Sequence, residues 1–195
     1  MTQTMAEYKE LIKGMLKPDR YRHSLNVAKS AVLLAKRYGE NEDKAYVCGV
    51  LHDMMKNTDL KEQQKIMRQA GISLMPIEEN NPKLWHAISA SAYMKLYLNI
   101  EDDHMLNAVR YHTTARPGMT PLEKIIYIAD YISDDRDYDG VEKMRQKAFE
   151  DIDEAIMEGT RFSITDLASR EMQIHPDTIN TYNEMCEKLS KVKGI

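Results

Sequence analysis

Apolar residues recur along almost the whole chain at intervals of three and four positions, the spacing of one face of an α-helix. The clearest stripe follows Pro18 and consists of Leu25, Ala28, Val32 and Ala35. Glycine commonly ends helices, so Gly39 predicts the end of this one. No segment alternates apolar and polar residues as a half-buried strand does. The pattern predicts an all-α chain.

Capping signals divide the rest of the chain into further helices. Asn41 predicts the start of a helix that includes His52, Asp53 and Met55. Asp59 resembles the first residue of a capping box, and the helix that it opens is expected to close at Gly71, before a loop over residues 72–82. Further helices are expected over residues 83–98, up to His112, after the capping box Thr120-Pro-Leu-Glu123, over 141–156 and over 179–189.

Composition limits the class of protein. A chain of 195 residues with 43% hydrophobic content is expected to form a single domain, residues 1–195, folded as a helical bundle. The net charge of -4 has no long run of one sign, so neither nucleic acid nor an anionic membrane is an expected partner. Cys48 and Cys186 have no metal-ligand spacing and are expected to be reduced. Without a signal peptide or a membrane-spanning run, the protein is expected in the cytoplasm.

Histidine and aspartate interrupt the apolar stripes at several points. His52 and Asp53 are adjacent, and four further candidates lie on other expected helices: His23, His86, His112 and Asp130. Imidazole nitrogen and carboxylate oxygen suit iron, manganese or zinc, and such a metal makes water nucleophilic near neutral pH. Together these residues predict a metal-dependent phosphohydrolase site formed by several helices.

Each candidate also has a structural interpretation. His23 could be a hydrogen-bonded histidine of the core, and His86 could cap a helix. Asp53 and Asp130 are stronger evidence for a metal site, because burying an ionised carboxylate among apolar neighbours costs several kcal/mol unless a cation compensates it. Asp130 is the only charged residue in the stretch 125–132. His104 follows an acidic stretch and is expected to be solvated.

The order His, His-Asp, His, His, Asp resembles the HD-domain superfamily of metal-dependent phosphohydrolases, whose fold is an α-helical bundle. Six motifs are similar to the bacterial YqeK-type family of symmetrical bis(5'-nucleosyl)-tetraphosphatases: Arg20-Tyr-Arg-His23, Leu51-His-Asp-Met-Met-Lys56, His112-Thr-Thr-Ala-Arg-Pro-Gly-Met119, Leu122-Glu-Lys-Ile125, Ala129-Asp-Tyr-Ile132 and Arg136-Asp-Tyr-Asp-Gly-Val141. The resemblance implies cleavage of diadenosine tetraphosphate into two molecules of ADP at an iron-containing site.

The same resemblance implies roles for individual residues. The implied metal ligands are His23, His52, Asp53 and Asp130. The positions near the nucleotide phosphates are Lys56, His86, His112, Thr113 and Arg136, with Arg20 beside them. A late segment resembles the part of the family that contacts the nucleoside: Gln173, Ile174, His175, Pro176, Asp177 and Thr178. Ala87 and Ala115 replace glycines that are usual in the family, and the added methyl groups could restrict the approach of phosphate to the backbone.

In the implied reaction, water activated by the metal attacks a β-phosphorus. Asp53, Lys56, His86 and His112 are the expected catalytic residues, of which Asp53 orients the water and the others neutralise phosphoryl charge. His86 and His112 could instead hold a second metal. Other interpretations stay open: an HD phosphohydrolase for another nucleotide, a di-iron oxygenase, or a nucleotide-binding protein without catalysis. A homodimer is also possible.

Overall fold

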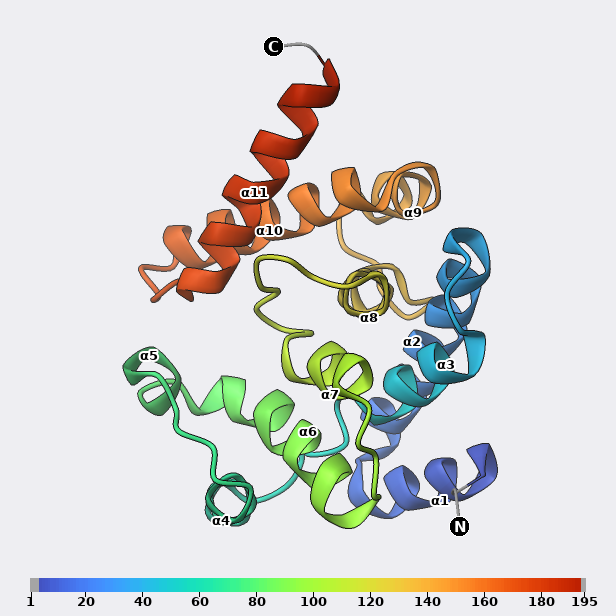
Figure 1. Ribbon diagram of the computed structural model, residues 1–195, viewed down its shortest axis with the longest axis vertical. Helices are drawn as coiled ribbons and strands as arrows, with labels where there is room; N and C mark the ends of the chain where they lie inside the picture. Colours follow the sequence, from blue (N-terminus) through green and yellow to red (C-terminus); the bar gives the residue numbers. More distant parts are fainter. Residues whose placement is uncertain (1–3, 194–195) are drawn as a thin grey trace.

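The computed structural model describes residues 4–193, and within that range the chain folds into helices and contains no strand. The prediction of an all-α fold is confirmed (Figure 1). In chain order the helices are α1 (Met5–Met15), α2 (Pro18–Tyr38), α3 (Glu42–Leu51), α4 (Leu60–Gln69), α5 (Pro76–Glu79), the 3-10 helix η1 (Pro82–Leu84), α6 (Trp85–Tyr97), α7 (Asp103–Arg110), α8 (Pro121–Ile132), α9 (Val141–Glu150), α10 (Ile152–Ser169) and α11 (Pro176–Lys193).

Helix α8 lies in the middle of the molecule, where Figure 1 shows it end-on. It packs against α2, α3, α7, α9 and α10, and one apolar core cluster runs through these helices. Helices α2 and α3 are in close backbone contact at Gly49, where a Cβ atom would stand 2.5 Å from the Cα atom of Ala28. Glycine therefore lets the end of α3, with His52 just beyond it, lie against α2. Within the described residues, no helix has both the length and the apolar character needed to cross a membrane.

The predicted capping signals work as expected at several helix ends. The side chain of Asn41 accepts a hydrogen bond from the Lys44 amide (2.8 Å), and Thr120 forms a reciprocal capping box with Glu123. Gly39 ends α2 in the left-handed region, at φ 70°. These local signals fix where α2, α3 and α8 begin or end, and hence where their functional side chains lie.

Four expectations about the helices are wrong. Helix α7 ends at Arg110, so His112 lies in the turn that follows it. Helix α3 ends at Leu51, and residues 52–57 form tight turns in which Met54 and Lys56 donate to carbonyls three residues earlier. The expected helix over 141–156 is broken at Asp151, whose extended backbone (φ -149°) and side chain cap α10. The expected loop over 72–82 contains α5, because Glu78 bonds back to the Met75 amide (2.9 Å) and closes a helical turn.

A buried carboxylate links α5 to the carboxyl-terminal helices. Glu78 is 2% exposed, forms an ion pair with Arg110 at the end of α7, and lies 3.6 Å from Nε2 of His175 at the start of α11. Burial raises the pKa of Glu78, but the nearby His175 imidazole and the hydrogen bond from Arg110 outweigh burial and lower the pKa to about 2. This network holds the start of α11 near the segment that follows α7.

Replacing Glu78 by Gln is expected to lower the free energy of unfolding by about 1–3 kcal/mol at neutral pH, because Arg110 then keeps a charge without its partner. The carboxyl pKa is lower in the folded protein than the ordinary value of 4.5. Its contribution is therefore complete above pH 4.5 and disappears as the pH falls through about 2. Urea unfolding of both proteins at a series of pH values measures this difference.

The matched control is Glu79→Gln, since Glu79 is the exposed neighbour of Glu78 on the same helix. The control should leave the free energy of unfolding within about 0.5 kcal/mol of the wild type. A deficit of Glu78→Gln that stays constant down to pH 2 would show that the charge of Glu78 is not its cause.

Candidate metal centre

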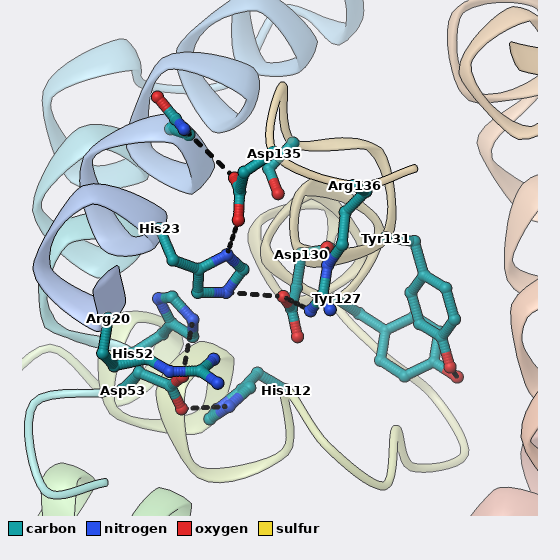
Figure 2. Close-up of polar contacts among 12 residues, drawn as sticks. Arg20, His23, His52, Asp53, His112, Tyr127, Asp130, Tyr131, Asp135 and Arg136 are labelled. Atoms are coloured by element: carbon teal, nitrogen blue, oxygen red, sulfur yellow. Dashed lines mark hydrogen bonds and ion pairs between the residues drawn. The ribbon is translucent and has the colours of Figure 1, made fainter. Parts of the chain in front are cut away.

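Six side chains from separate parts of the chain meet beside α8. His23 comes from the second turn of α2, His52 and Asp53 from the turn after α3, His112 from the turn after α7, and Asp130 from α8 (Figure 2). The sixth, His86, comes from the start of α6, and its Nε2 lies 3.1 Å from Asp53 Oδ1. Potential ligand atoms of His23, His52 and Asp130 lie within 4.8 Å of one another, and so do those of His52, Asp53 and His112. The structure thus brings together all six residues singled out in the sequence.

The histidines form a row with their rings nearly edge to face. Ring centroids are 5.4 Å apart for His23 and His52, 4.9 Å for His52 and His112, and 5.2 Å for His86 and His112. In three of the rings, Nδ1 forms a hydrogen bond with the backbone carbonyl three residues earlier: His52 with Gly49 (2.7 Å), His86 with Lys83 (2.7 Å) and His112 with Val109 (2.8 Å). A carbonyl only accepts, so Nδ1 carries the proton and Nε2 keeps its lone pair for a ligand.

Several buried polar atoms at the centre have no hydrogen-bond partner among the described residues. They are His23 Nε2, His52 Nε2 and Asp53 Oδ1. His23 Nε2 is only 3.0 Å from Asp130 Oδ1, and Asp53 Oδ1 is 3.1 Å from His86 Nε2, but neither contact has hydrogen-bond geometry. Unpartnered buried acceptors are costly unless something else satisfies them. Their convergence fits a divalent metal ion, which the centre could hold.

Charge at the centre is concentrated on Asp53, which is 2% exposed. Burial raises its pKa, yet His52, His112 and His86 outweigh burial and hold the pKa well below its usual range. Arg20 places Nη1 2.9 Å from Asp53 Oδ2, and Lys56 places Nζ 3.7 Å from Oδ1. Asp53 is therefore an ionised carboxylate in a buried, polar setting.

His52 and Asp130 are also in the protonation state that a metal ligand requires. Burial lowers the pKa of His52 to about 4, so this imidazole is neutral near pH 7. Burial raises the pKa of Asp130, but the adjacent His23 imidazole and the charge of Arg136 prevail and lower it far below its usual range. Arg136 also donates from Nε to the Asp130 carbonyl (2.8 Å) and forms an ion pair with its carboxylate.

Asp135 is a functional candidate that the sequence did not reveal. Its Oδ2 accepts from Nδ1 of His23 at 2.7 Å, and its Oδ1 accepts from Asn26 at 3.1 Å. A carboxylate on the far nitrogen of a histidine fixes the tautomer and makes the other nitrogen a better ligand. Asp135 lies in a turn after α8 and 112 positions from His23, so no local pattern pointed to this pairing.

Cations and hydroxyls surround the centre. Nζ of Lys56 donates to Nε2 of His86 (3.1 Å), and both side chains line a cavity of about 480 Å³ with Lys83. On the other side, His112, Thr113, Asp130 and Arg136 line a cavity of about 380 Å³. The positions that the resemblance assigned to phosphate thus flank the centre on both sides.

The segment 173–178 lies farther out. Gln173, His175 and Thr178 line a cavity of about 190 Å³ together with Thr113, whereas Ile174, Pro176 and Asp177 are not among its lining residues. Thr178 donates to the Thr114 carbonyl (2.8 Å), which ties the start of α11 to the loop after α7. His175 accepts at Nδ1 from the Asp177 amide (3.2 Å), so part of its role is to form the turn into α11.

The two alanines that replace family glycines are both fully buried in the core. Ala87 is helical, whereas Ala115 has φ 56°, a left-handed conformation that glycine adopts more easily. The left-handed backbone at position 115 explains why glycine is usual there in the family.

Comparison with known proteins agrees with this geometry. Residues 20–135 match the sequence profile of the HD domain family. A protein named symmetrical bis(5'-nucleosyl)-tetraphosphatase from Halalkalibacterium halodurans is 39% identical over 176 residues, which is 90% of this chain and 94% of that protein. One of the same name from Bacillus subtilis is 35% identical, covering 88% and 92% of the two chains.

A solved structure is also similar. The crystal structure of a predicted HD superfamily hydrolase involved in NAD metabolism, from Clostridium acetobutylicum, superimposes with a TM-score of 0.92 at 32% sequence identity. The match covers 96% of this chain and all of the other.

The chain belongs to the HD-domain family. Within it, the similarity along nearly the full length of the curated relatives places the chain in the family of the symmetrical bis(5'-nucleosyl)-tetraphosphatases. Both levels of the resemblance stated from the sequence motifs are therefore confirmed.

Replacing Asp135 by Ala is expected to weaken metal affinity about 10- to 100-fold, because His23 then loses the carboxylate that orients it. Titration of metal-free protein in competition with a chromogenic chelator measures the dissociation constant. The exposed neighbour Asp134, replaced by Ala, is the matched control and should bind metal as the wild type does. Equal affinities for all three proteins would remove Asp135 from the metal centre.

Proposed function

We propose that this protein hydrolyses dinucleoside tetraphosphates symmetrically, and that it converts diadenosine tetraphosphate into two molecules of ADP. The observation that carries the proposal is the convergence of unpartnered His and Asp atoms between two cation-lined cavities. The names of the full-length relatives supply the substrate class. A substrate with four linked phosphates requires several cations, and Arg20, Lys56 and Arg136 surround the centre.

Under this proposal, His23, His52, Asp53 and Asp130 would hold iron. When bound, the metal acts as a Lewis acid and lowers the pKa of water to near neutrality. His112 belongs to a second group of possible ligands with His52 and Asp53, so a second metal beside it is compatible with the proposal. His86 is in neither group, and its Nε2 accepts a hydrogen bond from Lys56.

The protein groups then have distinct tasks. Arg20 and Lys56 hold the Asp53 carboxylate. This carboxylate would accept a hydrogen bond from the attacking water, orient it, and take its proton as the bond to phosphorus forms. The water oxygen bonds to one β-phosphorus, the bond from that phosphorus to the central bridging oxygen breaks, and the departing ADP keeps the bridging oxygen. Cations stabilise the charge that develops on the phosphoryl oxygens.

Lys56, His86, His112, Thr113 and Arg136 are the proposed phosphate-binding group. Lys56 contacts both Asp53 and His86, so it lies where phosphoryl charge would meet the centre. Arg136 is fixed by two contacts with Asp130. For the nucleoside, we assign the segment 173–178, in which Gln173, His175 and Thr178 line a cavity next to Thr113.

Anaerobic incubation of iron-loaded protein with diadenosine tetraphosphate, followed by chromatography, tests the reaction. ADP is the expected sole product, and Asp53→Ala is expected to lose both metal binding and hydrolysis. Formation of AMP plus ATP would contradict the symmetrical cut. Absence of turnover, with hydrolysis of other nucleotides instead, would favour a different HD phosphohydrolase, and oxygen-dependent chemistry would favour an oxygenase.

Replacing Lys56 by Ala is expected to leave metal content unchanged and to reduce kcat about 100- to 1,000-fold, since one positive charge is removed from the transition state. Steady-state kinetics and metal analysis of the same preparation measure both quantities. Lys61→Ala, on the exposed face of α4, is the control and should match the wild type. Loss of metal from the Lys56 variant would instead assign this residue to metal binding.

A further inference from the structure

The cavity beside Asp130 and Arg136 has an outer wall that the proposed phosphate chemistry does not require. This aromatic pocket, of about 380 Å³, is bounded on its inner side by His112, Asp130 and Arg136 and on its outer side by Tyr131, Tyr138 and Phe162. Figure 2 shows Tyr131 next to Asp130 and Arg136, on the side away from His52. The pocket therefore opens directly onto the metal centre and ends in three aromatic rings.

The rings are held in place by hydrogen bonds and by each other. Tyr138 donates from its hydroxyl to the Tyr131 carbonyl (3.1 Å), and the Tyr131 hydroxyl contacts Oγ of Ser163 (2.6 Å). The Phe162 ring centroid is 5.6 Å from that of Tyr138, at 33° between planes, and 6.4 Å from that of Tyr131, edge to face. A fixed aromatic wall binds a flat ligand at low entropic cost.

Gly159 makes this arrangement possible. A Cβ atom at this position would stand 3.3 Å from the ring of Tyr127 and 3.5 Å from that of Tyr131. The missing side chain lets α10 pack closely on the tyrosines of α8, and Phe162 lies one turn farther along α10. Phe162 nevertheless stays 50% exposed, so its ring adds little to the core and presents a face to the pocket.

A dinucleoside tetraphosphate has two nucleosides, one at each end of the phosphates. The proposed function assigns one nucleoside to the segment 173–178. The cavity lined by this segment adjoins the aromatic pocket, because Thr113 lines both. The cavity beside Lys56 and His86 has no phenylalanine, tyrosine or tryptophan among its lining residues. Bases stack on aromatic side chains with about 1–3 kcal/mol each and with little dependence on base identity.

We propose that the aromatic pocket binds the second nucleoside of the substrate, with its base stacked on Phe162 and Tyr138 and its phosphates directed to Arg136. This assignment rests on the proposed function and adds a subsite to it. It makes Phe162 a determinant of the preference for substrates with a nucleoside at both ends. Since stacking tolerates any base, the pocket accepts adenine and guanine alike.

The sequence offers a direct spectroscopic test, because it contains only two phenylalanines, Phe149 and Phe162. Protein labelled with 4-fluorophenylalanine and loaded with diamagnetic zinc should give two fluorine NMR signals, which Phe162→Leu assigns. Titration with ADP is expected to shift the Phe162 signal saturably and to leave the Phe149 signal in place. A Phe162 signal that does not move at saturating ADP would overturn the proposal.

Kinetics on the iron-loaded enzyme distinguish a loss of nucleoside binding at this subsite from a loss of the reaction itself. Phe162→Leu is expected to raise KM for diadenosine tetraphosphate about five- to 100-fold, and Phe162→Trp, which restores a ring, should return KM to near the wild-type value. Adenosine 5'-tetraphosphate has one nucleoside and can use the other subsite, so its KM, or its inhibition constant, should change less than twofold. Phe149→Leu, a partly exposed residue on α9, is the matched control.

The outcomes are distinguishable. Normal cleavage to ADP with an unchanged KM in Phe162→Leu would refute the aromatic subsite and leave the proposed function intact. An ADP-dependent shift of the Phe162 signal in a protein that does not cleave diadenosine tetraphosphate would support the subsite and refute the proposed reaction. An equal rise in KM for both substrates would assign Phe162 to general packing and would also overturn the proposal.

Discussion

The buried carboxylate of Asp53 is the group on which the rest of the site depends. An ion in this position is unfavourable unless positive charge or strong donors surround it. Arg20 and Lys56 supply part of that compensation, but Oδ1 stays without a hydrogen bond and faces imidazole nitrogens that are themselves acceptors. A divalent metal ion would satisfy all these atoms together. The same low-dielectric setting strengthens every electrostatic interaction with a bound phosphate.

Helix ends give the centre its precision. His52 and His112 lie just beyond α3 and α7, where each ring donates from Nδ1 to a carbonyl of the preceding helix. The rigid helix thus orients the imidazole, and no loop conformation needs to be selected on binding. On its other side, the hairpin of α10 and α11 brings Phe162 and the segment 173–178 to the edge of the same site. In the proposed function, the core helices supply the metal ligands and the carboxyl-terminal hairpin binds the nucleosides.

Local patterns in the sequence predicted much of this architecture. The all-α class, the start of α8 at its capping box and the six central His and Asp residues followed from periodicity, capping and charge burial. The sequence did not predict that α3 stops before His52, because apolar Met54 and Met55 continue the helical pattern through a turn. Asp135, Glu78 and Phe162 were missed for another reason: their partners are distant in sequence, and only the tertiary fold brings them together.

The central claim is that these residues form a metal centre. Anomalous diffraction from crystals grown without oxygen in the presence of ferrous iron, recorded on both sides of the iron edge, tests it most directly. The account predicts an iron peak in contact with His23, His52, Asp53 and Asp130. Absence of a peak between these residues, or iron bound only at the exposed His104, would contradict it.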